Sequence, residues 1–208
     1  LYMGMLNQTV AERIVPTDVY MLTGQMFHIP VALAMNYLAH GCPCVLINFE
    51  AKKALKAIEQ EKVSAFLGIT TMLNWMMAEK DFEKYDLSSL RNIQYGGGPM
   101  PASVVRAALK SFPCTLIQGY GQTEGMTMTF LSQEDHHNAI NDANEKKLSS
   151  CGRAGFVTEV KVVDGDGNSV PKDGCSSGEI LIEPEAHPMG DSHKPDLRAN
   201  TITKRCGR

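Results

Sequence analysis

The sequence contains little of what marks specialised classes of protein. It has one tryptophan among 208 residues, 7% aromatic side chains and no excess of positive charge, because 20 Lys and Arg stand against 23 Asp and Glu. This slightly acidic balance disfavours a dedicated nucleic-acid-binding protein, which usually needs a basic face. The apolar stretch at residues 29–35 falls well short of the roughly 18 residues that cross a membrane. We therefore expect a globular protein with no nucleic-acid partner and no transmembrane segment.

The six cysteines form neither a metal-binding nor a disulfide pattern. Only Cys42 and Cys44 lie close together, and Cys-Pro-Cys is not a metal-ligand spacing. Scattered cysteines are typical of reduced thiols, so we expect a cytoplasmic location. The sequence also lacks Gly-x-x-x-x-Gly-Lys-[Ser/Thr], which excludes a standard P-loop nucleotide hydrolase.

Strand-like and helix-like segments alternate through the first two thirds of the chain. Apolar runs predict short buried strands at residues 45–47, 64–69, 92–95 and 115–118. Helical spacing of apolar residues predicts helices at residues 51–62, from residue 72 through residue 76, and after Pro101. This alternation is typical of βαβ units and predicts a mostly parallel sheet.

The pattern changes beyond residue 130. Residues 132–148 are polar and predict a loop with a short helix, whereas residues 160–163 and 177–183 predict two antiparallel strands near a Gly/Asp-rich turn. We therefore predict an α/β fold in which a parallel-sheet βαβ subdomain (residues 1–148) precedes part of a small β-rich, barrel-like subdomain with an irregular tail (residues 149–208).

Two glycine-rich motifs stand where a predicted strand ends. Gly96-Gly97-Gly98-Pro99 follows one strand, and Gly119-Tyr120-Gly121-Gln122-Thr123-Glu124 follows the next. Glycines at such positions let a backbone approach a ligand closely, although a tight turn alone also requires them. Because parallel strands end at the same edge of a sheet, we expect both motifs at the edge where α/β proteins bind ligands.

The second motif carries three groups suited to a nucleotide. Tyr120, on what we expect to be an exposed loop, offers a flat face for stacking on a base. Thr123 offers a hydroxyl for a phosphate oxygen, and Glu124 offers a carboxylate for a Mg²⁺ ion that bridges phosphates.

Other candidate groups have equally plain structural interpretations. His28 fits either a pocket near a substrate carboxyl group or a packed, hydrogen-bonded histidine. Six methionines fit either an adaptable acyl pocket or core packing: Met21, Met26, Met35, Met72, Met76 and Met77.

Taken in order, these motifs resemble the adenylate-forming superfamily, and fatty acyl-CoA synthetases in particular. The resemblance covers nearly the whole chain, and its most specific part is the Tyr-Gly-x-Thr-Glu core at residues 120–124. Further matching pieces are Asp18-Val19-Tyr20, Met26-Phe27-His28-Ile29, Gly68-Ile69-Thr70-Thr71, Asp86-Leu87-Ser88-Ser89-Leu90-Arg91, Cys151-Gly152-Arg153-Ala154-Gly155 and Gly178-Glu179-Ile180.

The resemblance implies a role for each matching position. It implies a nucleotide site built from Gly97, Gly98, Pro99, Gln118, Gly119, Tyr120, Gly121 and Gln122. It implies catalytic roles for Thr123, Glu124 and His28, with Glu124 holding Mg²⁺. It implies an acyl pocket shaped by Gly68, Ile69, Thr70 and Thr71.

The implied reaction has two steps. A carboxylic acid and ATP give an acyl-adenylate, and CoA then attacks it to give a thioester, so the expected cofactors are ATP or AMP, Mg²⁺ and CoA. The family's phosphate loop, ribose-binding motif and C-terminal domain find no counterpart here, so we expect a piece of a synthetase that is inactive alone. The parent enzyme would then be at most peripheral to a membrane, and surfaces exposed by truncation would favour self-association.

Two other readings of the residues stay open. The first is a non-catalytic binding module that keeps the fold without the chemistry. The second is an adenylation domain of a peptide synthetase, which usually places an Asp in its pocket. Ala32, Leu33 and Ala34 stand at that point of this sequence, with no acid nearby.

Overall fold

The computed structural model describes residues 2–24, 26–123, 125–142 and 144–184, together with the backbone of residues 202–203 and 206–207. A seven-stranded sheet in the order β2-β1-β3-β4-β5-β6-β7 forms its centre. Its strands are β1 (Tyr20–Leu22), β2 (Cys44–Leu46), β3 (Ala65–Leu67), β4 (Asn92–Gly96), β5 (Thr115–Gln122), β6 (Met126–Leu131) and β7 (Arg153–Ala154).

The first five strands are parallel to one another, as the alternating pattern predicts. Strands β6 and β7 are antiparallel additions at one edge. The sequence analysis missed β6, because it expected residues 119–124 to be a loop. In the structure β5 continues through Gln122 and turns back as a hairpin, with a shift in register between Tyr120 and Gly121.

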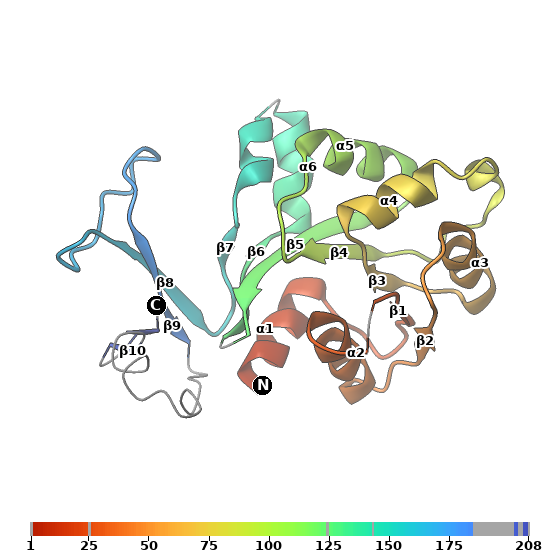
Figure 1. Ribbon diagram of the computed structural model, residues 1–208, viewed down its shortest axis with the longest axis horizontal. Helices are drawn as coiled ribbons and strands as arrows, with labels where there is room; N and C mark the ends of the chain where they lie inside the picture. Colours follow the sequence, from red (N-terminus) through yellow and green to blue (C-terminus); the bar gives the residue numbers. More distant parts are fainter. Residues whose placement is uncertain are drawn as a thin grey trace.

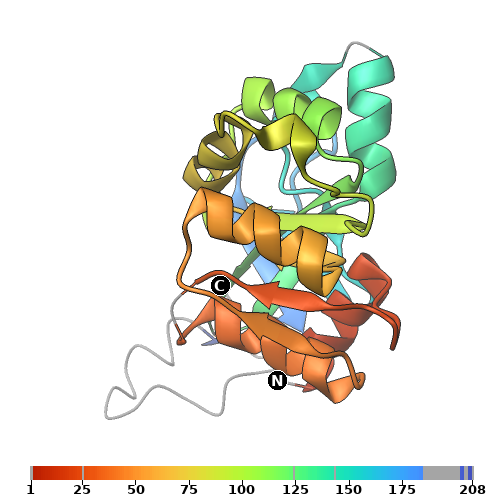
Figure 2. The same ribbon diagram turned by 90° about the vertical axis from the view of Figure 1, so that its right-hand side faces the viewer.

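Helices cover both faces of this sheet (Figure 1). One face carries α3 (Ala51–Glu61), α4 (Thr70–Met77), α5 (Ala102–Ser111) and α6 (Gln133–Asn141), and the other carries α1 (Tyr2–Glu12) and α2 (Ile29–Ala39). Figure 2 shows α2 and α3 on opposite sides of β1 and β2. Short 3₁₀ turns lie at Phe82–Lys84 and Glu145–Ser149.

The alternation of side chains along each strand produces two cores. Met21 and Phe66 pack with α3, α4 and α5, whereas Tyr20, Leu22 and Ala65 pack with α2. Since successive strand residues point to opposite faces, apolar residues at every position are what a doubly covered parallel strand requires. Tyr20 and Tyr37 stack with ring centroids 4.4 Å apart in the second core.

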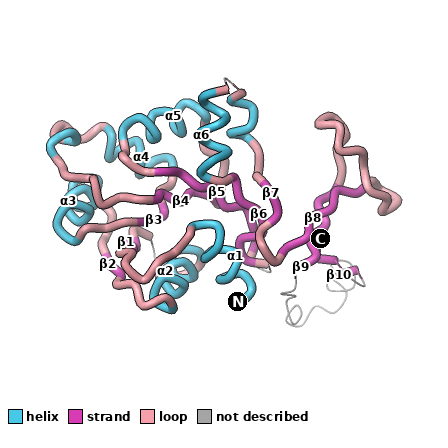
Figure 3. The backbone as a smooth tube through the Cα atoms, turned by 180° about the vertical axis from the view of Figure 1, so that it is seen from behind, coloured by secondary structure: helices cyan, strands magenta, loops and turns pink. Residues whose placement is uncertain are grey.

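A second sheet follows the first along the chain. Strands β8 (Thr158–Val163) and β9 (Glu179–Pro184) pair antiparallel, as predicted, and the sheet order is β10-β11-β9-β8 with β10 (Ile202–Thr203) and β11 (Cys206–Gly207). Figure 3 shows these strands beyond β7, at the end of the molecule away from β2. The predicted domain boundary at residue 148 stays a prediction, and most of the expected irregular tail lies outside the described residues.

One asparagine joins the two parts. The side-chain amide of Asn7 on α1 donates to the Thr158 hydroxyl at 2.8 Å, and its oxygen accepts from the Val157 backbone N–H at 2.8 Å. A Cβ atom at Gly155 would lie 2.7 Å from the same amide, so the chain passes close against α1 here. The start of β8 is therefore fixed to the first helix.

Among the described residues, the helices are all too short or too polar to cross a membrane. The described part of the chain also holds no group of three or more His, Cys, Asp or Glu side chains arranged for a metal ion.

Candidate functional site

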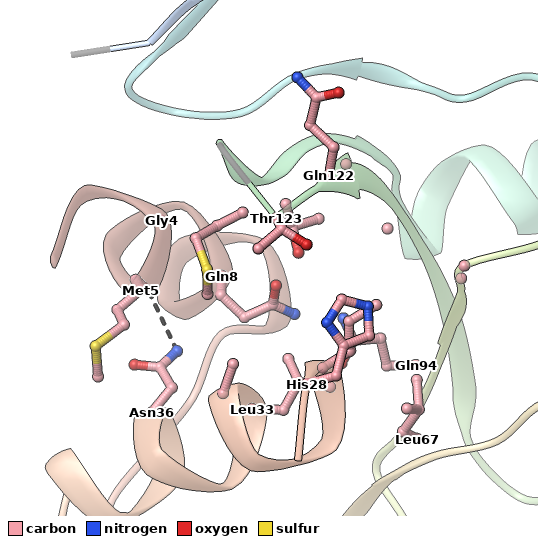
Figure 4. Close-up of a pocket in the computed structure, with 18 residues that line it drawn as sticks. Gly4, Met5, Gln8, His28, Leu33, Asn36, Leu67, Gln94, Gln122 and Thr123 are labelled. Carbon is pink, nitrogen blue, oxygen red and sulfur yellow. Dashed lines mark hydrogen bonds between the residues drawn. The ribbon is translucent and has the colours of Figure 1, made fainter. Parts of the chain in front are cut away.

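A cavity of about 470 Å³ lies where the carboxyl ends of β4 and β5 meet α1 and the start of α2 (Figure 4). Its size is ordinary for a small-molecule site. The two glycine-rich motifs meet at this edge, as expected, because Gly96 and Gly119 are direct partners in the β4–β5 ladder. The cavity wall includes Gly96, Gly97, Gly119, Gly121, Gln122, Thr123, Met126 and Thr127 from these strands and their turns.

The glycines at this edge meet two different demands. A Cβ atom at Gly121 would lie 1.9 Å from the Met126 carbonyl oxygen, so this glycine allows the β5–β6 hairpin to close. Gly97 has φ +74° and meets only Ile29 at 4.0 Å, while a Cβ atom at Gly98 would meet nothing within 4 Å. The first motif therefore leaves open space beside bare backbone, which suits the flat face of a ligand ring.

Tyr120 and Thr123 lie near each other in sequence but differ in setting. Thr123 is exposed in the β5–β6 turn and lines the cavity. Tyr120 is part of β5 rather than of the expected loop, is 38% exposed, and is not on the cavity wall. Glu124, the expected Mg²⁺ ligand, lies outside the described residues.

The remaining predicted positions divide between the wall and its surroundings. His28, Gly97, Gly119, Gly121 and Gln122 line the cavity, whereas Gly98, Pro99 and Gln118 do not. Gly68, Ile69, Thr70 and Thr71, predicted to shape the acyl pocket, follow β3 and start α4, and the wall takes the preceding residue, Leu67. The role predicted for each of these residues stays a prediction.

The methionines divide in the same way. Met21 on β1 and Met76 on α4 are fully buried in the core on the α3 and α4 face of the sheet, so for them the structural interpretation holds. The methionines that line the cavity are Met5 on α1 and Met126 on β6, and neither is among the six that the sequence analysis considered.

Two residues on the wall have unusual backbone geometry. His28 has φ 60° and Met126 has φ 59°, backbone angles that residues other than glycine rarely adopt. His28 directly precedes α2, whose first turn contains Pro30, and its carbonyl accepts from the Ala32 N–H at 3.2 Å. Strained residues of this kind often cluster at ligand sites, and both of these border the same cavity.

Three amide side chains form a polar part of the wall that the sequence did not predict. Gln8 on α1, Asn36 on α2 and Gln94 on β4 all line the cavity and are 3%, 1% and 5% exposed. Asn36 donates to the Met5 carbonyl at 3.2 Å. Gln94 Oε1 is buried without a hydrogen-bond partner. Lone amides in helix-forming or strand-forming stretches carry no recognisable motif, so only the fold brings these three together.

The buried carboxyl group of Glu12 fixes the Gln8 side chain by a hydrogen bond. Gln8 donates to Glu12 Oε1, and the Tyr37 hydroxyl donates to Glu12 Oε2 at 2.6 Å. Burial raises the pKa of Glu12 to about 7, against the opposing effects of the Tyr37 and Gln8 hydrogen bonds and the nearby Arg91 charge. The orientation of Gln8 therefore depends on a group that is only partly ionised near neutral pH.

The Asp18 and Arg91 pieces of the family-like motifs form an ion pair away from the cavity. Arg91 contacts both carboxylate oxygens of Asp18, at 2.6 and 3.0 Å, and also donates to the Glu12 carbonyl at 2.9 Å. Burial opposes ionisation of Asp18, but hydrogen bonds from Arg91, Val15 and Ser64 together hold its pKa below the usual value. This bidentate pair fixes the end of α1 against β4, which is a structural role.

Comparison with known proteins decides the family. The model of the family described as "AMP-binding enzyme" matches residues 2–187. This chain belongs to that family. It is 32% identical over 159 residues to the medium/long-chain-fatty-acid–CoA ligase FadD8 of Mycobacterium tuberculosis, a match that covers 76% of this chain and 26% of FadD8.

Solved structures of two synthetases have the same fold. The amide bond synthetase McbA of Marinactinospora thermotolerans aligns with a TM-score of 0.85 and 26% identity, covering 99% of this chain and 41% of that one. The O-succinylbenzoate coenzyme A synthetase MenE of Bacillus subtilis, solved with ATP and magnesium, aligns with a TM-score of 0.84 at 21% identity over 100% of this chain and 41% of that one. The chain thus spans less than half the length of each of these three proteins.

Proposed function

We propose that this chain supplies the acyl-adenylate pocket of an ATP-dependent acid–thiol ligase. The observation that carries the proposal is the cavity at the carboxyl edge of β4 and β5, where bare glycine backbone, a threonine hydroxyl and an apolar wall meet. In open α/β sheets this edge is the usual position of a bound nucleotide. The reaction joins a carboxylate to the α-phosphate of ATP with release of pyrophosphate, and then passes the acyl group to the CoA thiol with release of AMP.

Each residue has a defined task in this proposal. The open space over Gly97 and Gly98 receives the adenine ring, with Tyr120 stacking from the adjacent strand. Thr123 donates its hydroxyl to an α-phosphate oxygen, and His28 borders the carboxylate of the acid. The apolar wall of Leu33, Met5 and Met126 takes the body of the acid. The similarity to FadD8, a medium/long-chain-fatty-acid–CoA ligase, favours an acyl chain as that body.

The charge of the described cavity wall bears differently on ligand binding and on catalytic turnover. No Lys or Arg is among the described residues that line the cavity. Stabilising the charge that develops on a departing pyrophosphate is usually a large part of catalysis. We therefore expect this chain to bind an acyl-adenylate but to release pyrophosphate from ATP and an acid slowly. Mg²⁺ would neutralise phosphate charge at Glu124, which carries the matching motif position.

The test is isothermal titration of the chain with hexanoyl-sulfamoyl-adenosine, a stable analogue of an acyl-adenylate. We expect binding that Thr123→Val and Tyr120→Ala each weaken by about tenfold or more. Two matched variants, Thr17→Val in an exposed turn and Phe156→Ala at an exposed aromatic, should bind like the unaltered chain.

Two results would overturn the proposal. The first is a chain that is folded by circular dichroism yet binds no analogue at millimolar concentration. The second is binding that neither Thr123→Val nor Tyr120→Ala alters, because the ligand would then occupy another part of the molecule.

A further inference from the structure

Two residues on the cavity wall, Met126 and Gly4, are of types that their backbone positions disfavour. Met126 begins β6 with φ 59°, an angle that hairpin turns often require and that glycine or asparagine adopts most easily. Gly4 lies inside α1, where glycine is a poor helix former. Arg13 and Lys62 also have positive φ, but each directly follows the last residue of a helix, where left-handed backbone is common.

The contact between these two residues explains both choices. A Cβ atom at Gly4 would lie 2.5 Å from Met126 Cβ and 2.7 Å from Met126 Cγ, so the methionine side chain packs directly on bare helix backbone. Because the backbone fixes the Met126 Cβ atom, rotation of the side chain cannot relieve this contact. The Asn7 amide also reaches the Thr127 carbonyl at 3.4 Å, so α1 and β6 lie side by side here. The Met126 side chain therefore fills the gap between the helix and the strand.

This gap lies at the wall of the cavity. Figure 4 shows α1, with Gly4 and Gln8, beside the turn that carries Thr123. Glycine at residue 126 would avoid the unfavourable backbone angle, but it would leave the gap between α1 and β6 open. Methionine is long, unbranched and apolar, and it fills irregular spaces well. Closing the wall beside the apolar space is thus a task that the Met126 side chain performs and glycine could not.

We propose that Met126 limits the length of the acid that this site accepts: its side chain, packed on Gly4, closes the cavity between α1 and β6, and a longer body would have to displace it. This inference rests on the proposed function and names its substrate class. The cavity of about 470 Å³ has to hold the adenylate as well as the body of the acid, which favours a short or medium acyl chain over a long one.

The experiment compares four probes by isothermal titration: hexanoyl-, octanoyl-, decanoyl- and dodecanoyl-sulfamoyl-adenosine. In the unaltered chain we expect the dodecanoyl probe to bind about tenfold weaker or more than the hexanoyl probe, because an overfilled cavity forces its wall to move. Met126→Ala should remove most of this difference by strengthening the dodecanoyl probe. Met126→Leu, which keeps a side chain of similar volume, should keep the difference.

Met35→Ala is the matched control. Met35 is a methionine on α2 that is 56% exposed and does not line the cavity. The ratio of the hexanoyl and dodecanoyl affinities should therefore be the same in Met35→Ala as in the unaltered chain. Cooperative urea unfolding of each variant confirms that the comparison is made on folded protein.

A second experiment tests the contact between Met126 and Gly4 without any ligand. Gly4→Ala is made in the unaltered chain and in Met126→Gly, and the midpoint of urea unfolding is measured for each. With Met126 present, the added methyl group has no space and the midpoint should fall. With glycine at residue 126 the space is free, and the midpoint should rise because alanine is the better helix former. A change of the same sign in both backgrounds would contradict the contact.

The outcomes separate this proposal from the function beneath it. If the four probes bind the unaltered chain equally well, or more tightly as they lengthen, the length proposal is wrong while the adenylate site stands. The same holds if the dodecanoyl probe stays disfavoured in Met126→Ala. Equal weakening of all four probes in Met126→Ala also contradicts the proposal, because Met126 would then order the hairpin rather than limit the acid. If no probe binds to the folded chain, both the length proposal and the proposed function fall.

Discussion

Glu12 is a buried carboxyl group whose burial and raised pKa the surrounding sequence does not predict. It ends α1 and is 1% exposed. The residues around it are Gln8 on α1, Tyr37 on α2, Tyr20 on β1, and Asp18 and Arg91 in connecting segments. Its burial could not be foreseen, because the helix was not predicted and the partner tyrosine lies 25 residues away. Gln94 presents the same difficulty, since its missing partner is visible only in the folded chain.

A pH dependence of stability follows from Glu12. Its folded-state pKa is raised, so the native protein binds a proton that the unfolded chain releases, and stability falls as the pH rises from about 4.5 to about 7. This pKa rise corresponds to about 3 kcal/mol. Glu12→Gln keeps an oxygen that accepts from Gln8 and offers an amide N–H to the Tyr37 hydroxyl, and it carries no titrating group. It should therefore remove the decline, measured as the free energy of urea unfolding at pH 5, 6.5 and 8.

The comparison between the two proteins isolates Glu12 from other titrating groups. Burial lowers the pKa of His136, which makes stability rise with pH in the unaltered chain and in the variant alike. The difference between the two curves therefore reports Glu12. Parallel curves between pH 5 and 8 would show that the carboxyl group is not protonated in the folded chain.

At the scale of elements, two glycines distinguish folding from binding: Gly98, just after β4, and Gly121, within β5. A Cβ atom at Gly98 meets open space, so Gly98→Ala should leave the free energy of unfolding within about 0.5 kcal/mol. It should nevertheless weaken binding of the acyl-adenylate analogue, because the added methyl group occupies the open space proposed for the adenine ring. Gly121→Ala would place a methyl group against the Met126 carbonyl and should destabilise the hairpin by several times that amount.

Urea unfolding and titration calorimetry of the two variants together test this distinction. If Gly98→Ala binds the analogue as tightly as the unaltered chain does, the adenine ring does not occupy the space over Gly98. Gly121→Ala that is as stable as the unaltered chain would contradict the close approach of β5 and β6.

The parallel strands and their helices were predictable because the spacing of apolar residues, and the Gly and Pro residues between segments, are local features of the sequence. The helix at Ala51–Glu61 was predicted at residues 51–62, and β4 was predicted at residues 92–95 and spans Asn92–Gly96. Helix α1 and strand β6 were missed: α1 mixes polar and apolar side chains without a clear stripe, and β6 follows glycines that read as a loop. The predicted glycine motifs met at one edge, whereas the amide wall, drawn from three elements, had no local signal.

At the scale of the whole molecule, Asn7 connects the two sheets. Its amide bonds Thr158 and the Val157 backbone while buried at 3% exposure. Asn7→Ala leaves both partners unsatisfied, so we expect a loss of about 2–3 kcal/mol in the free energy of unfolding. Thr9→Ala, two residues later on α1, removes a hydroxyl whose shortest bond, to the Met5 carbonyl at 2.8 Å, lies within its own helix. Its other contacts, to Asn36 and His40, are long at 3.4 Å and do not reach β8, so the change should cost much less.

Hydrogen exchange gives the spatial readout for this variant. The amides of β8 should exchange faster in Asn7→Ala, while those of β3 and β4 keep their protection. Uniform acceleration across both sheets would show instead that the two parts unfold as a single unit.

The central claim is that the ligand site lies at the carboxyl edge of β4 and β5. The most direct measurement is a ¹⁵N chemical-shift map of the chain titrated with hexanoyl-sulfamoyl-adenosine. We predict that the amides of Gly97, Gly119 and Gly121 shift, while Gly41 and Gly165 on open surface stay in place. A second, open hollow lies at the opposite edge of these strands, beside Ser88 and Thr115. Shifts centred there, with the cavity glycines unmoved, would contradict the account.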